Sequence, residues 1–197
     1  MKQIPIKIGL TGGIGSGKST ISKLLTLYEL PLYDSDSNAK RLMETDSEII
    51  ARISLLFGEK SYIEGKLNRQ LLAEQVFVSA DKLHKLNNIV HSAVIDDFHR
   101  WVEDQNNKAV VFESAIIFEN HLEEHFDTTI AVISPKRLRL ERVKHRSGLS
   151  NKEILNRIAN QASNRTLREK ADFIIVNNEK SAVIPQIEFI LRHILNI

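Results

Sequence analysis

The chain has 197 residues, of which 42% are hydrophobic and 26% charged, a composition typical of a globular protein with one good core and room for an inserted subdomain. Its 27 Lys and Arg residues nearly balance 25 Asp and Glu residues, so the net charge of +2 argues against a dedicated nucleic-acid-binding protein. The absence of cysteine excludes disulfides, thiolate metal sites and cysteine nucleophiles, and no apolar run approaches the length of a membrane span, so we expect a cytoplasmic enzyme.

Residues 6–20, IKIGLTGGIGSGKST, join a short apolar run to a Gly-rich loop. The run Ile6–Leu10 is too short for a helix and predicts a buried strand. The segment from Gly12 to Ser19 fits the P-loop pattern, in which main-chain N–H groups surround a phosphate, Lys18 reaches the β- and γ-phosphates and the Ser19 hydroxyl binds Mg²⁺. Apolar residues at helical spacing follow, and the start of a helix favours an anion. This order predicts a site for a nucleoside triphosphate and Mg²⁺.

A second short strand is predicted at residues 30–33, and it ends at Asp34-Ser35-Asp36. Acidic residues at the end of a strand in an open α/β sheet lie where ligands bind. Asp36 is therefore the candidate general base, able to accept a proton from an attacking hydroxyl or to help hold Mg²⁺. The alternative is that Asp34 and Asp36 only cap the next helix.

Residues 38–106 have a helical pattern without a good strand, which predicts an insertion in the α/β core. A helical insertion beside a P-loop commonly holds the second substrate. Asn68 is positioned to cap one of its helices, and Arg69 in the first turn opposes the helix dipole, so an anionic partner would explain it. His91 lies in the middle of a long helix, where a lone histidine is more often structural.

Strands are predicted again at residues 109–112, 128–133 and 172–176, and the last helix carries Pro185 in its first turn. The alternation of short apolar strands with helices predicts a parallel sheet of about five strands connected by right-handed crossovers. Residues 1–37 and 107–197 would form this nucleotide-binding core.

A basic helix is predicted from Pro135 to about His145, followed by a break at Ser147-Gly148-Leu149 and a capping box formed by Ser150 and Glu153. A basic run alone is usually a solvated helix face. Beside a P-loop, however, the break indicates a hinged lid at about residues 138–152, and arginines on a lid can clamp a triphosphate and exclude water. Of the basic residues, Arg142 and Arg146 are better candidates for this role than Arg137.

Two other classes of P-loop protein fit less well. Regulatory GTPases need an Asn-Lys-x-Asp motif, which the sequence lacks, although Asn177 after the last strand could lie near an adenine. Motor and transporter ATPases end a long apolar strand with aspartate, and Glu113 is an imperfect match. A compact chain with a helical insertion and an Arg-rich lid is best interpreted as a small-molecule kinase.

Motifs over nearly the whole chain resemble the dephospho-coenzyme A kinase family. In order they are GLTGGIGSGKS at 9–19, DSD at 34–36, LNR at 67–69, His91, IIFE at 116–119, Arg142 with Arg146, Gln161 and Asn177-Asn178. The resemblance implies a P-loop three-layer fold with strand order 2-3-1-4-5, the insertion being the coenzyme A domain. It also implies transfer of the ATP γ-phosphate to the 3′-hydroxyl of dephospho-CoA, with Mg²⁺.

The resemblance assigns roles to particular residues. The catalytic residues would be Asp36, Lys18 and Arg142. The ATP site would comprise Gly13, Ile14, Gly15, Ser16, Gly17, Lys18, Ser19, Thr20, Arg142, Arg146 and Asn177. The acceptor would contact Asp36, Arg69, His91 and Glu119, and Mg²⁺ would bind Ser19, with Asp36 as a further candidate ligand.

The chain departs from the family pattern at Ser92 and Ala115, where prolines are usual, which affects local loop geometry rather than chemical groups. A nucleoside or nucleotide kinase on the same scaffold, or a nucleotide-binding regulator that uses the basic helix as a contact surface, remains an alternative. The expected partners are ATP and dephospho-CoA, with no nucleic acid and no membrane, and the length suits a monomer-sized enzyme.

Overall fold

A computed structural model describes residues 4–148 and 150–196, so Leu149 of the expected lid break lies outside the described residues. The chain divides into two compact units. The core unit contains the residues up to Tyr33 and those from Asp104 onward, and the helical unit spans Asp34–Glu103. The sequence placed the insertion at residues 38–106. Within the described residues, no helix is long and apolar enough to cross a membrane.

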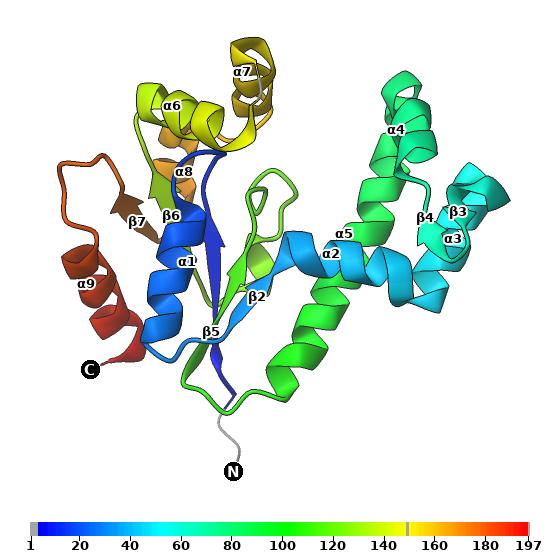
Figure 1. Ribbon diagram of the computed structural model, residues 1–197. Helices are drawn as coiled ribbons and strands as arrows, with labels where there is room; N and C mark the ends of the chain where they lie inside the picture. Colours follow the sequence, from blue (N-terminus) through cyan, green and yellow to red (C-terminus); the bar gives the residue numbers. More distant parts are fainter. Residues whose placement is uncertain (1–3, 149, 197) are drawn as a thin grey trace. The chain divides into compact units, whose positions relative to one another are not determined.

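The core unit is built on a five-stranded, all-parallel sheet in the order β2-β5-β1-β6-β7 (Figure 1). Its strands are β1 (Ile6–Thr11), β2 (Leu32–Asp34), β5 (Ala109–Glu113), β6 (Thr128–Ile133) and β7 (Phe173–Val176). Counted along the chain, these strands follow the order 2-3-1-4-5, so the expected α/β class and topology are confirmed. The central strand β1 pairs Ile8 with Val111 of β5 and Thr128 of β6.

Five α-helices of the described chain belong to the core unit: α1 (Lys18–Leu27), α6 (Lys136–Ser147), α7 (Asn151–Ala159), α8 (Asn164–Lys170) and α9 (Ile184–Leu195). A short 3₁₀ helix, η2, spans Glu123–His125. Pro185 lies in the first turn of α9, as expected. Helix α7 begins at the predicted capping box, in which Ser150 and Glu153 satisfy each other's main-chain N–H groups.

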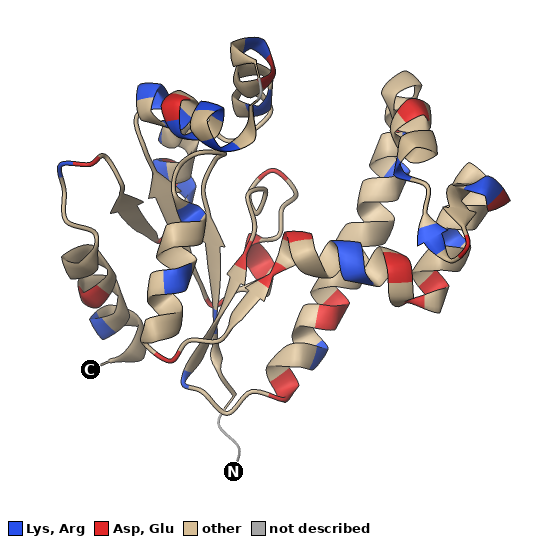
Figure 2. Cartoon of the chain, in the orientation of Figure 1, with Lys and Arg blue, Asp and Glu red and all other residues tan. Residues whose placement is uncertain are grey.

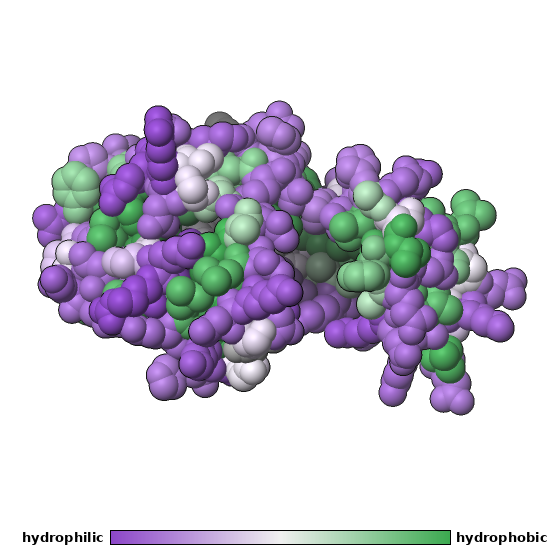
Figure 3. Space-filling view, turned by 90° about the horizontal axis from the view of Figure 1, so that it is seen from above, coloured by the Kyte–Doolittle hydropathy of each residue, from purple (hydrophilic) through white to green (hydrophobic). Residues whose placement is uncertain are grey.

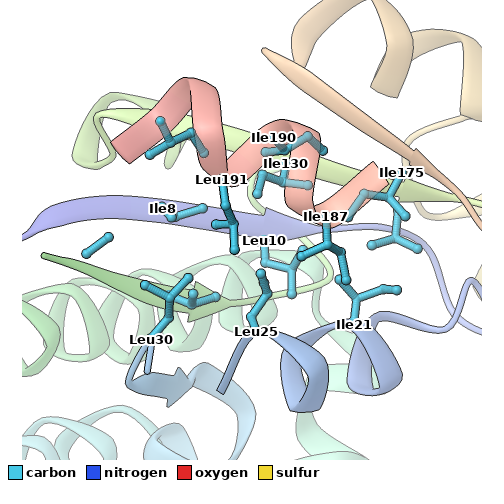
Figure 4. Close-up of a cluster of buried hydrophobic side chains, with 14 residues drawn as sticks. Ile8, Leu10, Ile21, Leu25, Leu30, Ile130, Ile175, Ile187, Ile190 and Leu191 are labelled. Carbon is cyan, nitrogen blue, oxygen red and sulfur yellow. The ribbon is translucent and has the colours of Figure 1, made fainter. Parts of the chain in front are cut away.

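The main hydrophobic core lies between one face of the sheet and helices α1 and α9 (Figure 4). Ile8 and Leu10 of β1 point into it and are fully buried. Helices α1 and α9 contribute apolar side chains at helical spacing: Ile21, Leu25, Ile187, Ile190 and Leu191. Each such side chain contributes about 1.5–3 kcal/mol on burial, so this packing fixes α1, and with it the loop that precedes α1.

On the other face of the sheet, Gly9 admits two bulky neighbours. A Cβ at Gly9 would lie 2.7 Å from the ring of Phe126 and 3.1 Å from Ile117. Phe126 also packs against Phe112, with ring centroids 5.0 Å apart. The absence of a side chain at Gly9 therefore lets residues 117–126 cover the sheet directly behind the strand that leads into the P-loop.

The helical unit contains α2 (Ser35–Thr45), α3 (Ser47–Phe57), the 3₁₀ helix η1 (Glu59–Ser61), α4 (Arg69–Val78) and α5 (Ala80–Glu103). Its centre is α5, whose buried face carries Ile89, Val94, Ile95, Phe98 and Val102. Asn68 caps α4 by accepting a hydrogen bond from the Leu71 N–H, as predicted. Tyr62–Ile63 and Lys66–Leu67 form a two-stranded hairpin, β3-β4, around Gly65. These strands of two residues each are the exception to the helical pattern expected over residues 38–106.

Several large apolar side chains of the helical unit face solvent, among them Leu55, Ile63, Phe77 and Val78. Hydrophobic residues appear among hydrophilic ones on this unit in the space-filling view (Figure 3). The core unit also exposes large apolar side chains, among them Leu27, Ile184 and Phe189, so exposure alone does not distinguish the helical unit.

Candidate phosphate-binding site

The loop between β1 and α1 has the backbone of an anion site. Gly12, Gly15 and Gly17 adopt φ values of 145°, 76° and 95°, which residues with a Cβ rarely reach. Gly17 is the N-cap of α1, and no side chain among the described residues caps this helix. The N–H groups at the start of a helix point out of its N-terminus, and the helix dipole favours a negative charge there. This geometry suits a phosphate chain.

Lys18 and Ser19 begin α1 beside the end of strand β5. Lys18 Nζ lies 3.8 Å from Glu113 Oε1, and the Ser19 hydroxyl donates to the same oxygen across 3.4 Å. The Lys18 and Glu113 side chains are only 14% and 13% exposed. Glu113, which the sequence offered only as an imperfect match to the strand-end aspartate of other P-loop proteins, thus joins the two residues that the motif assigns to phosphate and metal.

The oxygen groups at this point fit Mg²⁺. A hydroxyl and a carboxylate are hard oxygen ligands, which Mg²⁺ prefers. The described residues contain no group of three or more His, Cys, Asp or Glu that could hold a metal ion. Mg²⁺ at Ser19 and Glu113 would therefore take further ligands from water and substrate phosphates, which is its usual coordination in kinases.

Asn177, directly after β7, is hydrogen-bonded to the loop between β1 and α1. Its side-chain amide donates to the Ser16 carbonyl across 2.9 Å. A Cβ at Gly17 would lie 2.1 Å from the same amide nitrogen, so the contact requires glycine at that position.

Arg142 packs onto the loop rather than extending from α6 into solvent. Its guanidinium donates to the carbonyls of Gly15 and Ser16, each across 3.4 Å, and to Asn177. It also forms an ion pair of 3.1 Å with Glu179. The structure thus brings Arg142, Asn177 and the loop together, and the contact of Arg142 with a triphosphate stays a prediction.

The other basic residues of α6 differ in their surroundings (Figure 2). Arg137 is 78% exposed and pairs with Glu141, in keeping with its expected position in solvent. Arg146 is exposed in the last turn of α6, which ends at Gly148 in the left-handed conformation. Arg139, which the sequence did not single out, is 4% exposed and lies against the loop.

Arg139 and Gln161 are the residues that sequence reasoning missed. Arg139 Nε donates to the Ile14 carbonyl across 2.9 Å, and the Gln161 side-chain oxygen accepts the Ile14 N–H across 2.7 Å. Arg139 precedes Arg142 by about one helical turn, so the two share a side of the predicted helix. Gln161 belongs to the motif that resembles the family. The sequence therefore pointed to both residues without assigning a function to either.

Glu119 follows β5 and accepts the Ala162 N–H across 2.6 Å. Its other carboxylate oxygen is buried and has no hydrogen-bond partner among the described residues. This side chain therefore holds the segment that carries Gln161, and its expected contact with the acceptor stays a prediction.

The remaining expected site residues belong to the helical unit. Asp34 caps α2 by accepting from the N–H groups of Asp36 and Ser37, at 3.0 and 3.2 Å. Asp36 is exposed in the first turn of the same helix, so its carboxylate is not consumed by capping. The helix starts at Ser35 because Asp34 supplies this cap, three residues before the expected start.

Arg69 and His91 complete the expected acceptor set. Arg69 is 60% exposed and pairs with Glu44 across 3.1 Å, so Glu44 is the acidic neighbour of this arginine in the structure. His91 is half-buried in α5, and its burial lowers the pKa of the imidazole below the ordinary value.

Comparison with known proteins gives one consistent family. A family model described as dephospho-CoA kinase matches residues 6–182. The dephospho-CoA kinase of Bacteroides fragilis is 38% identical over 183 residues, which covers 92% of this chain and 89% of the relative.

Two solved structures are similar along nearly their whole length. The protein TT1252 from Thermus thermophilus superposes with a TM-score of 0.83 at 32% identity, covering 98% of each chain. A dephospho-CoA kinase from Campylobacter jejuni superposes with a TM-score of 0.67 at 25% identity, covering 95% of this chain and 96% of the other.

Proposed function

The chain belongs to the dephospho-CoA kinase family, and we propose that it transfers the γ-phosphoryl group of ATP to the ribose 3′-hydroxyl of dephospho-CoA, giving coenzyme A and ADP. The observation that carries the proposal is the uncapped start of α1 behind a glycine loop, with Lys18 at its first position. That arrangement supports a triphosphate, and family membership supports the acceptor.

In this proposal main-chain N–H groups of the loop, among them those of Gly15, Gly17 and Ser19, face the β- and γ-phosphates, and Lys18 neutralises charge that develops on the transferred group. Ser19 and Glu113 would hold Mg²⁺. When bound, the metal supplies further neutralisation of the phosphate oxygens. Arg142 and Arg146 would add positive charge from α6 when the triphosphate is in place, and Asn177 would border the nucleotide.

The reaction needs a base for the acceptor hydroxyl. The ribose oxygen forms a bond to the γ-phosphorus, the bond from that phosphorus to the β–γ bridging oxygen breaks, and ADP leaves with the electron pair. We assign the hydroxyl proton to Asp36, because this carboxylate is solvent-exposed and follows strand β2 of the same parallel sheet that carries the P-loop.

The acceptor itself carries phosphate and an apolar arm. We assign its recognition to the helical unit, through Arg69 and His91, with Glu119 as a further contact. The exposed apolar side chains of this unit, such as Phe77 and Val78, suit an acceptor that has both polar and apolar parts. A cytoplasmic location and a monomeric state remain predictions from the sequence.

A coupled assay with ATP and a panel of acceptors tests the proposal. Dephospho-CoA as the preferred acceptor would support it. Preference for a free nucleoside or monophosphate would instead favour a nucleoside or nucleotide kinase. Slow hydrolysis of ATP that no acceptor accelerates, together with salt-sensitive binding of oligonucleotides, would favour a nucleotide-binding regulator.

A further inference from the structure

Ile14, near the tip of the P-loop, has both its main-chain N–H and its main-chain carbonyl hydrogen-bonded to residues outside the loop. Its N–H donates to Gln161 Oε1 across 2.7 Å, and its carbonyl accepts from Arg139 Nε across 2.9 Å. Arg139 Nη2 in turn donates to Gln161 Oε1 across 3.4 Å, which closes the set into one network. Neither hydrogen bond of Ile14 therefore depends on the loop's own residues.

Arg139 also determines which residues the loop tolerates. A Cβ at Gly13 would lie 2.1 Å from Arg139 Nη2, and one at Gly15 would lie 2.5 Å from the Arg139 carbonyl. Gly13 does not adopt a positive φ, so its glycine is explained by the guanidinium against it rather than by backbone conformation. Helix α6 is thus packed directly on the loop at this point, and the expected lid is anchored there.

The charge of Arg139 is not balanced by a carboxylate. Within the described residues, no ion pair includes Arg139, and its side chain donates to the neutral oxygens of Ile14 and Gln161. The side chain is 4% exposed, and burial lowers the pKa of its guanidinium, but arginine stays protonated in proteins. A buried cation without a counter-ion, next to a loop built for an anion, favours binding of a negative ligand.

We propose that Arg139 and Gln161 are positioning residues of the phosphate site. They hold the main chain of Ile14 between them, so that the N–H groups of the residues that follow Ile14 are directed at a triphosphate before it binds. Arg139 adds its buried positive charge to the same site. Arg139 lies on α6 at the start of the expected lid, and Gln161 follows α7 beyond the end of that lid, so segments before and after the lid break both contact the loop tip. The inference rests on the proposed function only for the presence of a triphosphate in the loop.

The first test uses Arg139→Met and Gln161→Leu, which remove the hydrogen bonds while keeping most of the side-chain volume. We expect each variant to raise the Kd for inorganic tripolyphosphate and the KM for ATP about 5- to 20-fold, with the KM for dephospho-CoA changed less than about twofold. Both residues bind the main chain of Ile14. The Kd for tripolyphosphate in the double variant should therefore rise by less than the product of the two fold-increases seen in the single variants. Arg137→Gln, on the exposed side of the same helix, is the matched control and should match wild type.

The variant Gln161→Glu separates the hydrogen bond to Ile14 from the charge of Arg139. Its carboxylate can still accept the Ile14 N–H but also pairs with Arg139 and cancels its charge beside the anion, so the Kd for tripolyphosphate should rise about 5-fold or more while the Tm stays near that of wild type. Wild-type affinity for tripolyphosphate in Gln161→Leu and in Arg139→Met, with only a lower Tm, would overturn the proposal. Direct binding of tripolyphosphate involves no acceptor, so failure here is distinguishable from failure of the proposed kinase activity.

Discussion

The Asn177 side-chain amide and the Ser16 carbonyl are joined by a hydrogen bond of 2.9 Å, which links the residue after the last strand to the loop after the first. The two residues are 161 positions apart in the sequence. Strand β6 lies between β1 and β7 in the sheet, so this contact joins the segments that follow two strands that are not neighbours.

Loss of this contact should weaken ATP binding. In Asn177→Asp the donor that faces the Ser16 carbonyl becomes an acceptor, so we expect Kd for ATP to rise about 10-fold or more, and about 3- to 10-fold in Asn177→Ala. Asn178→Asp is the matched control, because Asn178 uses its side-chain oxygen as an acceptor for the Lys180 and Ser181 N–H groups and that oxygen survives the change. Calorimetric titration with ATP measures the difference; equal affinities for the two Asp variants would contradict it.

Asp36→Asn should lower kcat by about 10²- to 10⁴-fold while ATP still binds, as expected when a general base is lost. Asp34→Asn is the control, since asparagine keeps the acceptor oxygen that caps α2. Steady-state kinetics and ATP titration of both variants check this. Near-normal turnover in Asp36→Asn would remove Asp36 from the role of base.

Lys18→Ala should reduce phosphoryl transfer to every acceptor by about 10²- to 10³-fold, because the lysine stabilises charge that develops on the transferred group whatever the acceptor is. Lys23→Ala, on the exposed face of the same helix, should leave the rate unchanged. If Lys18→Ala slowed transfer to one acceptor only, the assignment of Lys18 to the phosphate cradle would be wrong.

Glu113→Gln tests the proposed metal position. Glu113 accepts from Ser19 and lies beside Lys18, so its neutralisation should raise the Mg²⁺ concentration for half-maximal activity about 10-fold or more. Glu141→Gln, which loses only an exposed ion pair with Arg137, serves as the control. An unchanged Mg²⁺ requirement would exclude Glu113 from the metal site.

His91 gives the helical unit a pH-dependent stability. Burial lowers its pKa in the folded state below the ordinary value of 6.5, so the unfolded chain takes up the proton first as the pH falls. The contribution of neutral His91 to stability is therefore complete above pH 6.5 and is lost as the pH falls below that value. Thermal unfolding between pH 5 and pH 8 should show a smaller acid loss of Tm in His91→Gln than in wild type; parallel curves would contradict this.

The sheet and the P-loop could be predicted because their signals are local. An apolar run bounded by glycines marks β1, and GxxxxGKS followed by apolar residues at helical spacing marks the loop and α1. The capping box at Ser150 was predictable for the same reason. The β3-β4 hairpin escaped notice because strands of two residues are too short to show an alternating pattern.

The supporting contacts of the site could not be predicted, because they join distant segments. Arg139 looks like any other residue of a basic helix until α6 is packed on the loop, and the structure buries it while leaving Arg137 exposed. Glu113 was discounted because an aspartate is usual at that position, yet its longer side chain reaches Ser19. Side-chain spacing on one helix shows which residues share a face but not what that face contacts.

The central claim is a specific transfer, from ATP to one hydroxyl of dephospho-CoA. The most direct measurement is ³¹P NMR of the products formed by the purified protein from ATP, Mg²⁺ and dephospho-CoA. We predict one new phosphomonoester signal, from the ribose 3′-phosphate of coenzyme A, formed in equal amount with ADP. Inorganic phosphate and ADP without a new phosphomonoester signal, or phosphate attached at another position of the acceptor, would contradict the account.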